Sequence, residues 1–274
     1  MNKNEKKLLN VGFIGCGKMA SAIIKGVLSS DFLASRQILA SEVSEEFASK
    51  KKEELGIEVV TNNKIIVQKS DVIFLATKPC YVKDVLDEIK DELNENKLIV
   101  SIAAGVRTST IESTITKEVP VIRVMPNGPA VIMQGMSGIV KGKFANEGHV
   151  EFVSQLFSNV GKCIIVDESQ IDVVTAISGS GPAFFYEIIH EMALAGEELG
   201  LEYDKSLLLA AQTAVGSANL MLQSDLTPEQ LVANIATKGG CTEVGVDFMK
   251  ESNTEKLFNE LITKTTKKAE ALGN

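Results

Sequence analysis

The residues best suited to hold a charged ligand lie in two glycine-rich stretches, one near each end of the chain. The first reads Gly15-Cys16-Gly17-Lys18-Met19-Ala20. An apolar run at residues 11–14 precedes it, and apolar residues at helical spacing follow it. Strand, glycine turn and helix in this order match the G-x-G-x-x-A fingerprint of a dinucleotide-binding unit.

The three small residues of this fingerprint have separate structural roles. Gly15 permits the tight turn, Gly17 lets the backbone approach a pyrophosphate, and Ala20 lets the helix pack closely on the strand. The N–H groups at the helix start carry a partial positive charge that attracts phosphate. We therefore predict a nucleotide site here, and the alternative is a purely structural turn.

The second stretch reads Gly239-Gly240-Cys241-Thr242. Successive backbone N–H groups in a glycine turn form a concave site that suits a carboxylate. The hydroxyl of Thr242 is also able to supply a proton to a reacting group. The alternative is that Thr242 only caps the helix that follows.

Alternating strand and helix patterns position the first stretch. Strands are expected at residues 11–14, 37–41, 58–60, 71–76, 98–101, 120–125, 138–140 and 162–166. Helices are expected between several of them, and turns at residues 62–63 and 126–130, where the prolines argue against a helix start. This pattern predicts a doubly wound α/β sheet over residues 1–167.

Ligands of such sheets bind at the carboxyl ends of the strands. Residues 76–79 (ATKP) and the small residues Ala103 and Ala104 follow two of these ends, so they are expected to line the cofactor crevice. Ser41 and Glu42 follow the second strand, where a dinucleotide places its adenosine ribose. If Glu42 faces the ribose it favours NADH over NADPH, and if it points to solvent it has no such effect.

From about residue 168 the pattern becomes helical. A helical stretch at 171–177 is expected to be interrupted by residues 178–182 (SGSGP), and helices are expected at 183–199, 205–223 and 254–272. Thr227, Pro228 and Gln230 form a capping box that starts another helix. Helix 205–223 is apolar nearly all round, so we predict that a second subunit buries it.

Composition limits the class of protein. Lys+Arg 28 against Asp+Glu 36 gives a net charge of −8, which argues against a nucleic-acid partner. No signal peptide or membrane span is expected, so the chain is predicted to be cytoplasmic. Four separated cysteines and two histidines make a metal site improbable.

Several separated motifs together resemble the pyrroline-5-carboxylate reductase family. These are residues 12–20 (GFIGCGKMA), 76–79 (ATKP), 101–105 (SIAAG), 125–127 (MPN), 175–183 (TAISGSGPA) and 239–242 (GGCT). The resemblance covers essentially the whole chain. It implies a Rossmann domain at 1–167, an all-α dimerisation and substrate domain at 168–274, and homodimers that assemble into decamers.

The reaction implied by the resemblance is the last step of proline biosynthesis, in which NADPH or NADH reduces the C=N bond of 1-pyrroline-5-carboxylate. The implied cofactor contacts are Gly15, Gly17, Lys18, Met19, Ala20, Ser41, Asn63, Ala76, Thr77, Lys78, Pro79, Ala103, Ala104 and Asn234. The implied substrate contacts are Glu168, Gly239, Gly240, Cys241 and Thr242, with Thr242 also as the catalytic group.

Two departures and one absence bear on the substrate. Family members commonly have threonine in place of Gly128 and a serine-proline pair in place of Thr237-Lys238. Related hydroxyacid dehydrogenases keep a lysine in the helix after their interdomain glycines, whereas this chain has none between Pro182 and Lys205. The missing lysine favours imine reduction over hydroxyacid oxidation. A nucleotide-sensing relative without catalysis is a further alternative.

Overall fold

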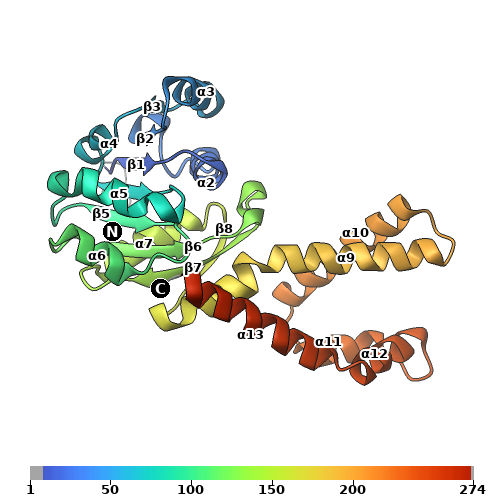
Figure 1. Ribbon diagram of the computed structural model, residues 1–274. Coiled ribbons are helices and arrows are strands. Elements are labelled where there is room, and N and C mark those ends of the chain that lie inside the picture. The colour runs from blue at the N-terminus through green and yellow to red at the C-terminus, as the bar shows by residue number, and fades with distance from the viewer. Residues whose placement is uncertain (1–8, 273–274) are drawn as a thin grey trace. The chain divides into compact units, whose positions relative to one another are not determined.

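A computed structural model describes residues 9–272, so residues 1–8 and 273–274 lie outside the described chain (Figure 1). The chain divides into two compact units. One is formed by residues up to Ser180 together with the segment from Thr266 onward, and the other by Gly181–Thr265. The predicted boundary between residues 167 and 168 stays a prediction.

The first unit is built on one eight-stranded sheet of order β3-β2-β1-β4-β5-β6-β7-β8. Its strands are β1 (Val11–Ile14), β2 (Ile38–Ser41), β3 (Glu58–Val60), β4 (Val72–Leu75), β5 (Leu98–Ser101), β6 (Val121–Met125), β7 (Gly135–Lys141) and β8 (Gly161–Ile165). Every neighbouring pair is parallel except β6 with β7. The predicted doubly wound α/β sheet is therefore confirmed.

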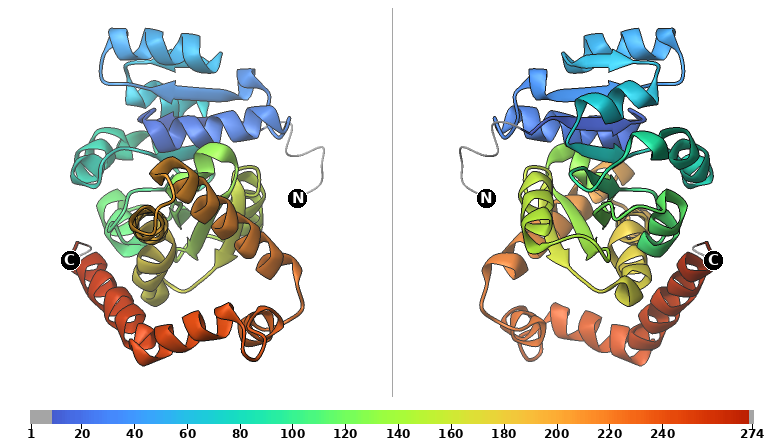
Figure 2. Two further views of the ribbon diagram at one scale, coloured as in Figure 1. Left: turned by 90° about the vertical axis from the view of Figure 1, so that its right-hand side faces the viewer. Right: turned by 90° about the vertical axis from the view of Figure 1, so that its left-hand side faces the viewer.

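Helices cover both faces of this sheet (Figure 2). They are α2 (Lys18–Ser29), α3 (Glu45–Leu55), α4 (Asn63–Lys69), α5 (Pro79–Ile89), α6 (Thr108–Ile115), α7 (Glu147–Phe157) and the short α8 (Ile171–Val174). Alternate strand residues enter two buried clusters, one with α2 and α7 and the other with α4, α5 and α6. Phe13 and Phe74 stack at 4.5 Å between ring centroids in the first cluster. Burial on both faces explains why the inner strands β1, β4 and β5 are almost entirely apolar.

Two expected turns of this unit are helical instead. Asn62 does not form a turn with Asn63 but caps α4, because its side chain accepts from the backbone N–H of Lys64. Residues 126–130 lead into a 3₁₀ helix, Gly128–Ile132, with Pro129 in its first turn. A proline there lacks only an N–H that a helix start leaves unpaired, which is why the prediction against a helix was wrong.

The second unit is helical. It contains α9 (Gly181–Glu198), α10 (Tyr203–Gln223), α11 (Pro228–Ile235), α12 (Cys241–Glu251) and most of α13 (Thr254–Leu272). Both hydrogen bonds of the predicted capping box are present at the start of α11: the Gln230 N–H donates to the Thr227 hydroxyl oxygen, and the Thr227 N–H donates to the Gln230 side chain. The expected interruption at residues 178–182 is narrower than predicted: a π-helical turn, Thr175–Gly179, precedes a bend at Ser180, and α9 begins at Gly181.

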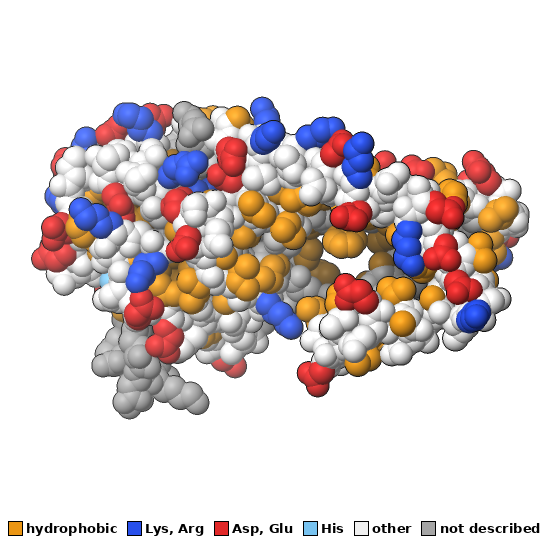
Figure 3. All heavy atoms as spheres, turned by 90° about the horizontal axis from the view of Figure 1, so that it is seen from below, with side chains coloured by type: hydrophobic (Ala, Val, Ile, Leu, Met, Phe, Trp, Pro, Cys, Tyr) orange, Lys and Arg blue, Asp and Glu red, His pale blue; other side chains and the backbone are white. Residues whose placement is uncertain are grey.

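Helix α10 has only Ser206 and Ala210 buried. Leu208, Leu209 and Leu222 are each at least 60 % exposed, and apolar side chains lie at the surface of the helical unit (Figure 3). No helix within residues 9–272 combines the length and the apolar character needed to cross a bilayer.

Candidate active site

The first glycine stretch forms the turn between β1 and α2. Gly15 has φ of +90°, and a Cβ there would lie 2.9 Å from the carbonyl oxygen of Ala76. Its N–H donates to the carbonyl of Ser41 at 3.1 Å, which fixes the turn to the end of β2. Gly17 caps α2, and a Cβ there would meet no atom within 4 Å. The turn therefore has open space at Gly17, where the fingerprint places a pyrophosphate.

The ends of β4 and β5 lie beside this turn. The N–H of Ala76 donates to the carbonyl of Ile14, and the N–H of Ile102 donates to the carbonyl of Leu75. These bonds bring residues 76–79, Ala103 and Ala104 to the carboxyl edge of the sheet. Lys78 and Ala104 are exposed there, whereas Ala103 is buried.

Glu42 does not point to solvent. It is half-buried, and its carboxylate Oε1 accepts from the backbone N–H of Cys16 at 3.0 Å. Beside it, the Ser41 hydroxyl donates to Asn63 Oδ1 at 2.7 Å, and the Asn63 amide donates to Glu88 at 2.8 Å. The predicted ribose-side residues Ser41 and Asn63 are thus brought together with Glu42 at the end of β2.

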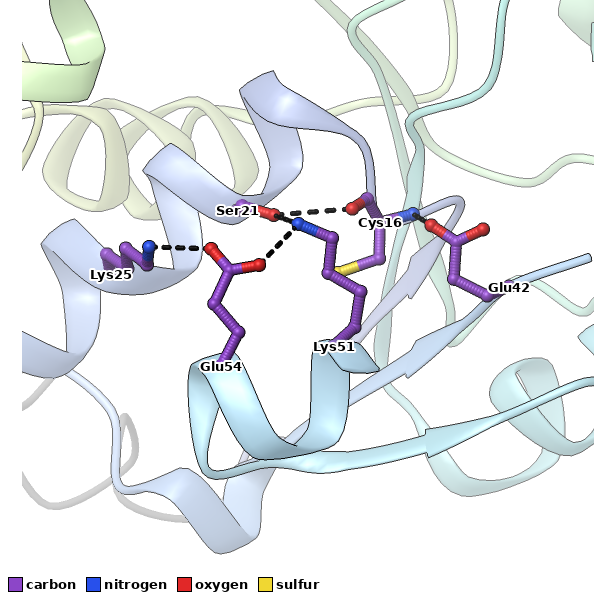
Figure 4. A network of polar contacts seen from close by, with 6 residues as sticks. All are labelled: Cys16, Ser21, Lys25, Glu42, Lys51 and Glu54. Carbon is purple, nitrogen blue, oxygen red and sulfur yellow. Dashed lines mark hydrogen bonds and ion pairs between the residues drawn. The ribbon is translucent and has the colours of Figure 1, made fainter. Parts of the chain in front are cut away.

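A polar network behind the turn joins α2 to α3 (Figure 4). The Ser21 hydroxyl donates to the carbonyl of Cys16 and accepts from the Lys51 ammonium. Lys51 is also ion-paired with Glu54 at 2.8 Å. Burial raises the pKa of the Cys16 thiol to about 11, so this thiol is neutral at physiological pH and is no nucleophile.

Two of the motifs lie against each other within the first unit. The Asn127 amide donates to the Ser178 carbonyl at 3.1 Å, and its oxygen accepts from the N–H of Met136. A Cβ at Gly179 would lie 2.8 Å from the Met125 side chain. Residues 125–127 therefore anchor the π-helical turn, a contact that the sequence reasoning did not predict.

Glu168 is engaged by two partners in the first unit. Arg123, 2 % exposed, donates to its Oε1 at 2.6 Å, while the Thr108 hydroxyl donates to Oε2 at 2.6 Å. These contacts join β6, α6 and the segment after β8. Sequence reasoning missed Arg123, although a charged residue inside an apolar strand is a signal of a buried partner. Substrate binding by Glu168 stays a prediction.

The second glycine stretch connects α11 to α12. Gly239 has φ of +77°, and its N–H donates to the Glu243 carboxylate at 2.7 Å. Gly240 caps α12, so Cys241 and Thr242 stand in its first turn, where the N–H groups have no acceptor within the helix. Asn234 and Lys238 are exposed on either side of residue 236 in the same unit. Binding of a carboxylate by this turn stays a prediction.

A second observation, besides the fingerprint, indicates that the residues at the sheet edge fit a dinucleotide. Among the described residues, the Thr77 hydroxyl is one of six buried side-chain polar atoms without a hydrogen-bond partner. It follows β4 at the predicted crevice, where a ligand would supply that partner. Within residues 9–272 no group of three or more potential metal ligands is present.

Family models match both parts of the chain. The model for pyrroline-5-carboxylate reductase dimerisation matches residues 168–272, and the model for NADP oxidoreductase coenzyme F420-dependent matches residues 10–105. A pyrroline-5-carboxylate reductase of Methanosarcina acetivorans is 37 % identical over 96 % of this chain and 97 % of its own. That of Pseudomonas aeruginosa is 36 % identical over 96 % of each chain.

Solved structures agree over the same length. A pyrroline-5-carboxylate reductase from Coxiella burnetii has a TM-score of 0.93 at 31 % identity, covering 97 % of this chain and 99 % of its own. The Plasmodium falciparum pyrroline carboxylate reductase, solved with NADP bound, has a TM-score of 0.85 at 28 % identity and covers 98 % and 99 %. On this full-length similarity, the chain belongs to the pyrroline-5-carboxylate reductase family.

Proposed function

We propose that this protein reduces 1-pyrroline-5-carboxylate to proline with NADPH or NADH as the hydride donor. One observation carries the proposal: curated reductases of this name match the chain over both units at 31–37 % identity. The glycine turn at Gly15 and Gly17 and the glycine turn at Gly239 supply the two binding features that such a reaction requires.

When bound, the dinucleotide supplies a hydride from the nicotinamide ring. The residues proposed to hold it in the first unit are Gly15, Gly17, Lys18, Met19, Ala20, Ser41, Asn63, Ala76, Thr77, Lys78, Pro79, Ala103 and Ala104. Asn234 is proposed as a further contact from the second unit. The exposed N–H groups at the start of α2 favour the pyrophosphate, and the small side chains of Ala103 and Ala104 leave room for a flat ring.

The substrate is a cyclic imine with a carboxylate. We propose that residues 239–242 bind the carboxylate through backbone N–H groups and the Thr242 hydroxyl, with Glu168 as a further substrate contact. A protonated C=N bond is already electrophilic, so the main requirement is to position its carbon against the hydride donor. The hydride adds to carbon and one proton adds to nitrogen, and Thr242 or water supplies that proton.

The helix after the π-helical turn supports imine reduction. Alcohol oxidation requires a positioned base, and α9 (Gly181–Glu198) contains no lysine.

We also propose a homodimer, with decamers as the larger assembly, and the domains 1–167 and 168–274. The exposed leucines of α10 support a partner subunit, because a soluble monomer rarely exposes such a patch. A cytoplasmic location is proposed as well. Four unpaired cysteines support it, since reducing compartments keep thiols free.

The direct test follows the loss of absorbance of NADH, and separately of NADPH, with purified protein and 1-pyrroline-5-carboxylate. Turnover with proline as the product is expected. Folded protein that binds a cofactor but reduces no imine would identify a nucleotide-sensing relative and overturn the proposal.

A further inference from the structure

We propose that Glu42 makes this enzyme select NADH over NADPH, by accepting hydrogen bonds from the adenosine ribose with a carboxylate that repels a 2′-phosphate. The inference rests on the proposed function only in the choice of a nicotinamide dinucleotide as the ligand.

The carboxylate of Glu42 is held at the ribose position by two elements. The Glu42 N–H donates to the Val60 carbonyl at 2.9 Å, so its backbone continues the pairing of β2 with β3. Its Oε1 accepts from the Cys16 N–H inside the glycine turn at 3.0 Å. The side chain thus joins the ends of β1 and β2, where the ribose of a bound dinucleotide lies. Its Oε2 accepts from the Val43 N–H at 3.3 Å. Each carboxylate oxygen accepts more than one hydrogen bond, so acceptor capacity remains for the ribose hydroxyls.

No arginine is available for a 2′-phosphate at this edge. The sequence has three arginines: Arg36, Arg107 and Arg123. Arg36 lies in the turn before β2, at the opposite end of that strand. Arg123 is buried against Glu168, and Arg107 lies 3.6 Å from Asp172. A 2′-phosphate would therefore meet no guanidinium group beside Glu42.

The α3 lysine that reaches the network behind the turn is already paired. Lys51 donates to Ser21 at 2.9 Å and to Glu54 at 2.8 Å, which holds its ammonium between α2 and α3 (Figure 4). A phosphate could recruit it only by displacing the Glu54 carboxylate.

Further carboxylates add to the negative field at the ends of β2 and β3. Glu88 accepts from the Asn63 amide at 2.8 Å, and Glu45 accepts from the Thr61 hydroxyl at 2.9 Å. The exposed Lys64, next to Asn63 in the sequence, is a cation in the same segment. It is therefore included in the test.

The test measures dissociation constants of NADH and NADPH by nicotinamide fluorescence, without substrate. Wild-type protein is expected to bind NADH at least about tenfold more tightly than NADPH. NADH gains one charge-assisted hydrogen bond from its ribose to Glu42, whereas the 2′-phosphate of NADPH is repelled by the same carboxylate. Glu42→Gln keeps an oxygen acceptor for the Cys16 N–H and removes only the charge. It is expected to bring the two constants within about threefold of each other, mainly through tighter NADPH binding.

Glu46→Gln is the matched control, since it removes one negative charge from an exposed position in the first turn of α3. Its NADPH-to-NADH ratio is expected to equal that of the wild type. An unchanged ratio in Glu42→Gln, or a wild-type preference for NADPH that Lys64→Ala abolishes, would overturn the proposal. Because no imine is present, failure to reduce 1-pyrroline-5-carboxylate would overturn the proposed function alone.

Discussion

Gly15 and Gly17 lie two residues apart in the same turn, yet their substitution by alanine has different expected effects. Gly15→Ala forces a positive φ on a residue with a Cβ and places that atom against the Ala76 carbonyl. It is expected to lower the free energy of unfolding by about 1–3 kcal/mol. Gly17→Ala meets open space at φ −69°, so it is expected to change stability by about 1 kcal/mol or less.

The same pair separates folding from cofactor binding. Gly17→Ala is expected to weaken NADH binding by about tenfold or more, because its methyl group occupies the approach of the pyrophosphate. Thermal unfolding and NADH titration of both variants provide the measurement. Unchanged NADH affinity in Gly17→Ala would show that this turn does not hold the pyrophosphate.

Thr242 provides a test of the second glycine stretch. Thr242→Val keeps the shape of the side chain and removes the hydroxyl, so kcat/KM for the imine is expected to fall about ten- to hundredfold. Thr242→Ser is expected to retain most of the activity. NADH affinity and thermal stability should not change in either variant. Full activity of Thr242→Val would show that the Thr242 hydroxyl has no part in substrate binding or catalysis.

The sequence was sufficient to locate the backbone of the cofactor turn but not the direction of its neighbouring side chains. Glycine is the residue that tolerates the positive φ of Gly15 and that leaves the space beside Gly17 open. The roles of both residues were therefore predictable from their type. The direction of Glu42 depends on the Cys16 N–H, 26 residues earlier, and no local pattern encodes that contact. The engagement of Glu168 by Arg123 likewise depends on strands meeting in the folded sheet.

The ion pair of Glu168 with Arg123 joins the segment after β8 to β6, and removing it tests how far the stability of the fold depends on this contact. Glu168→Ala leaves the Arg123 guanidinium, 2 % exposed, without its counter-ion. We expect the free energy of unfolding to fall by about 3 kcal/mol or more. Urea unfolding measures this change. A variant with wild-type stability and a raised KM for the imine would instead assign Glu168 to substrate binding alone.

The contact between α2 and α3 is expected to depend on pH. Hydrogen bonds from Lys25 and then Lys51 lower the pKa of Glu54 from 4.5 to about 2. This ion pair therefore stabilises the fold above pH 4.5 and loses its contribution as the pH falls towards 2. Because the Glu54 side chain is 35 % exposed and its partner Lys25 is 51 % exposed, solvent screening keeps this contribution small. Urea unfolding of Glu54→Gln should differ from wild type at pH 6, and this difference should vanish near pH 2.

Elements with a strong apolar pattern were predicted closely, and short polar helices were not. All eight strands were expected within a few residues of their positions, and burial on both faces leaves continuous apolar runs in the inner strands β1, β4 and β5. Helix α6 (Thr108–Ile115) was missed because its serines and threonines are weak helix formers. The sequence predicts an interruption at residues 178–182, since glycine and serine usually break a helix, whereas the π-helical turn, Thr175–Gly179, includes the first two of these residues. Packing against Asn127 and Met125 overrides that preference.

At the scale of the whole molecule, the apolar surface of α10 is arranged as a stripe. Leu208, Val215 and Leu222 follow one another at intervals of seven residues and are 69 %, 50 % and 65 % exposed. At 3.6 residues per turn they share one side of the helix, roughly opposite the buried Ser206 and Ala210. The sequence predicted that α10 needs a partner, because no polar face interrupts its apolar residues. It did not specify which side remains uncovered within one chain.

This stripe is expected to hold the proposed dimer together. Val215→Glu places a charge at its centre, and burying an unpaired carboxylate is strongly unfavourable. We therefore expect the variant to elute as a monomer in size-exclusion chromatography with light scattering, and to lose reductase activity while NADH binding to the sheet unit persists. Asn96→Glu adds the same charge to an exposed loop of the first unit and should leave the assembly intact. If Val215→Glu remained dimeric, a different surface of the helical unit would have to form the interface, and the exposed side of α10 would have to be covered only in a larger assembly.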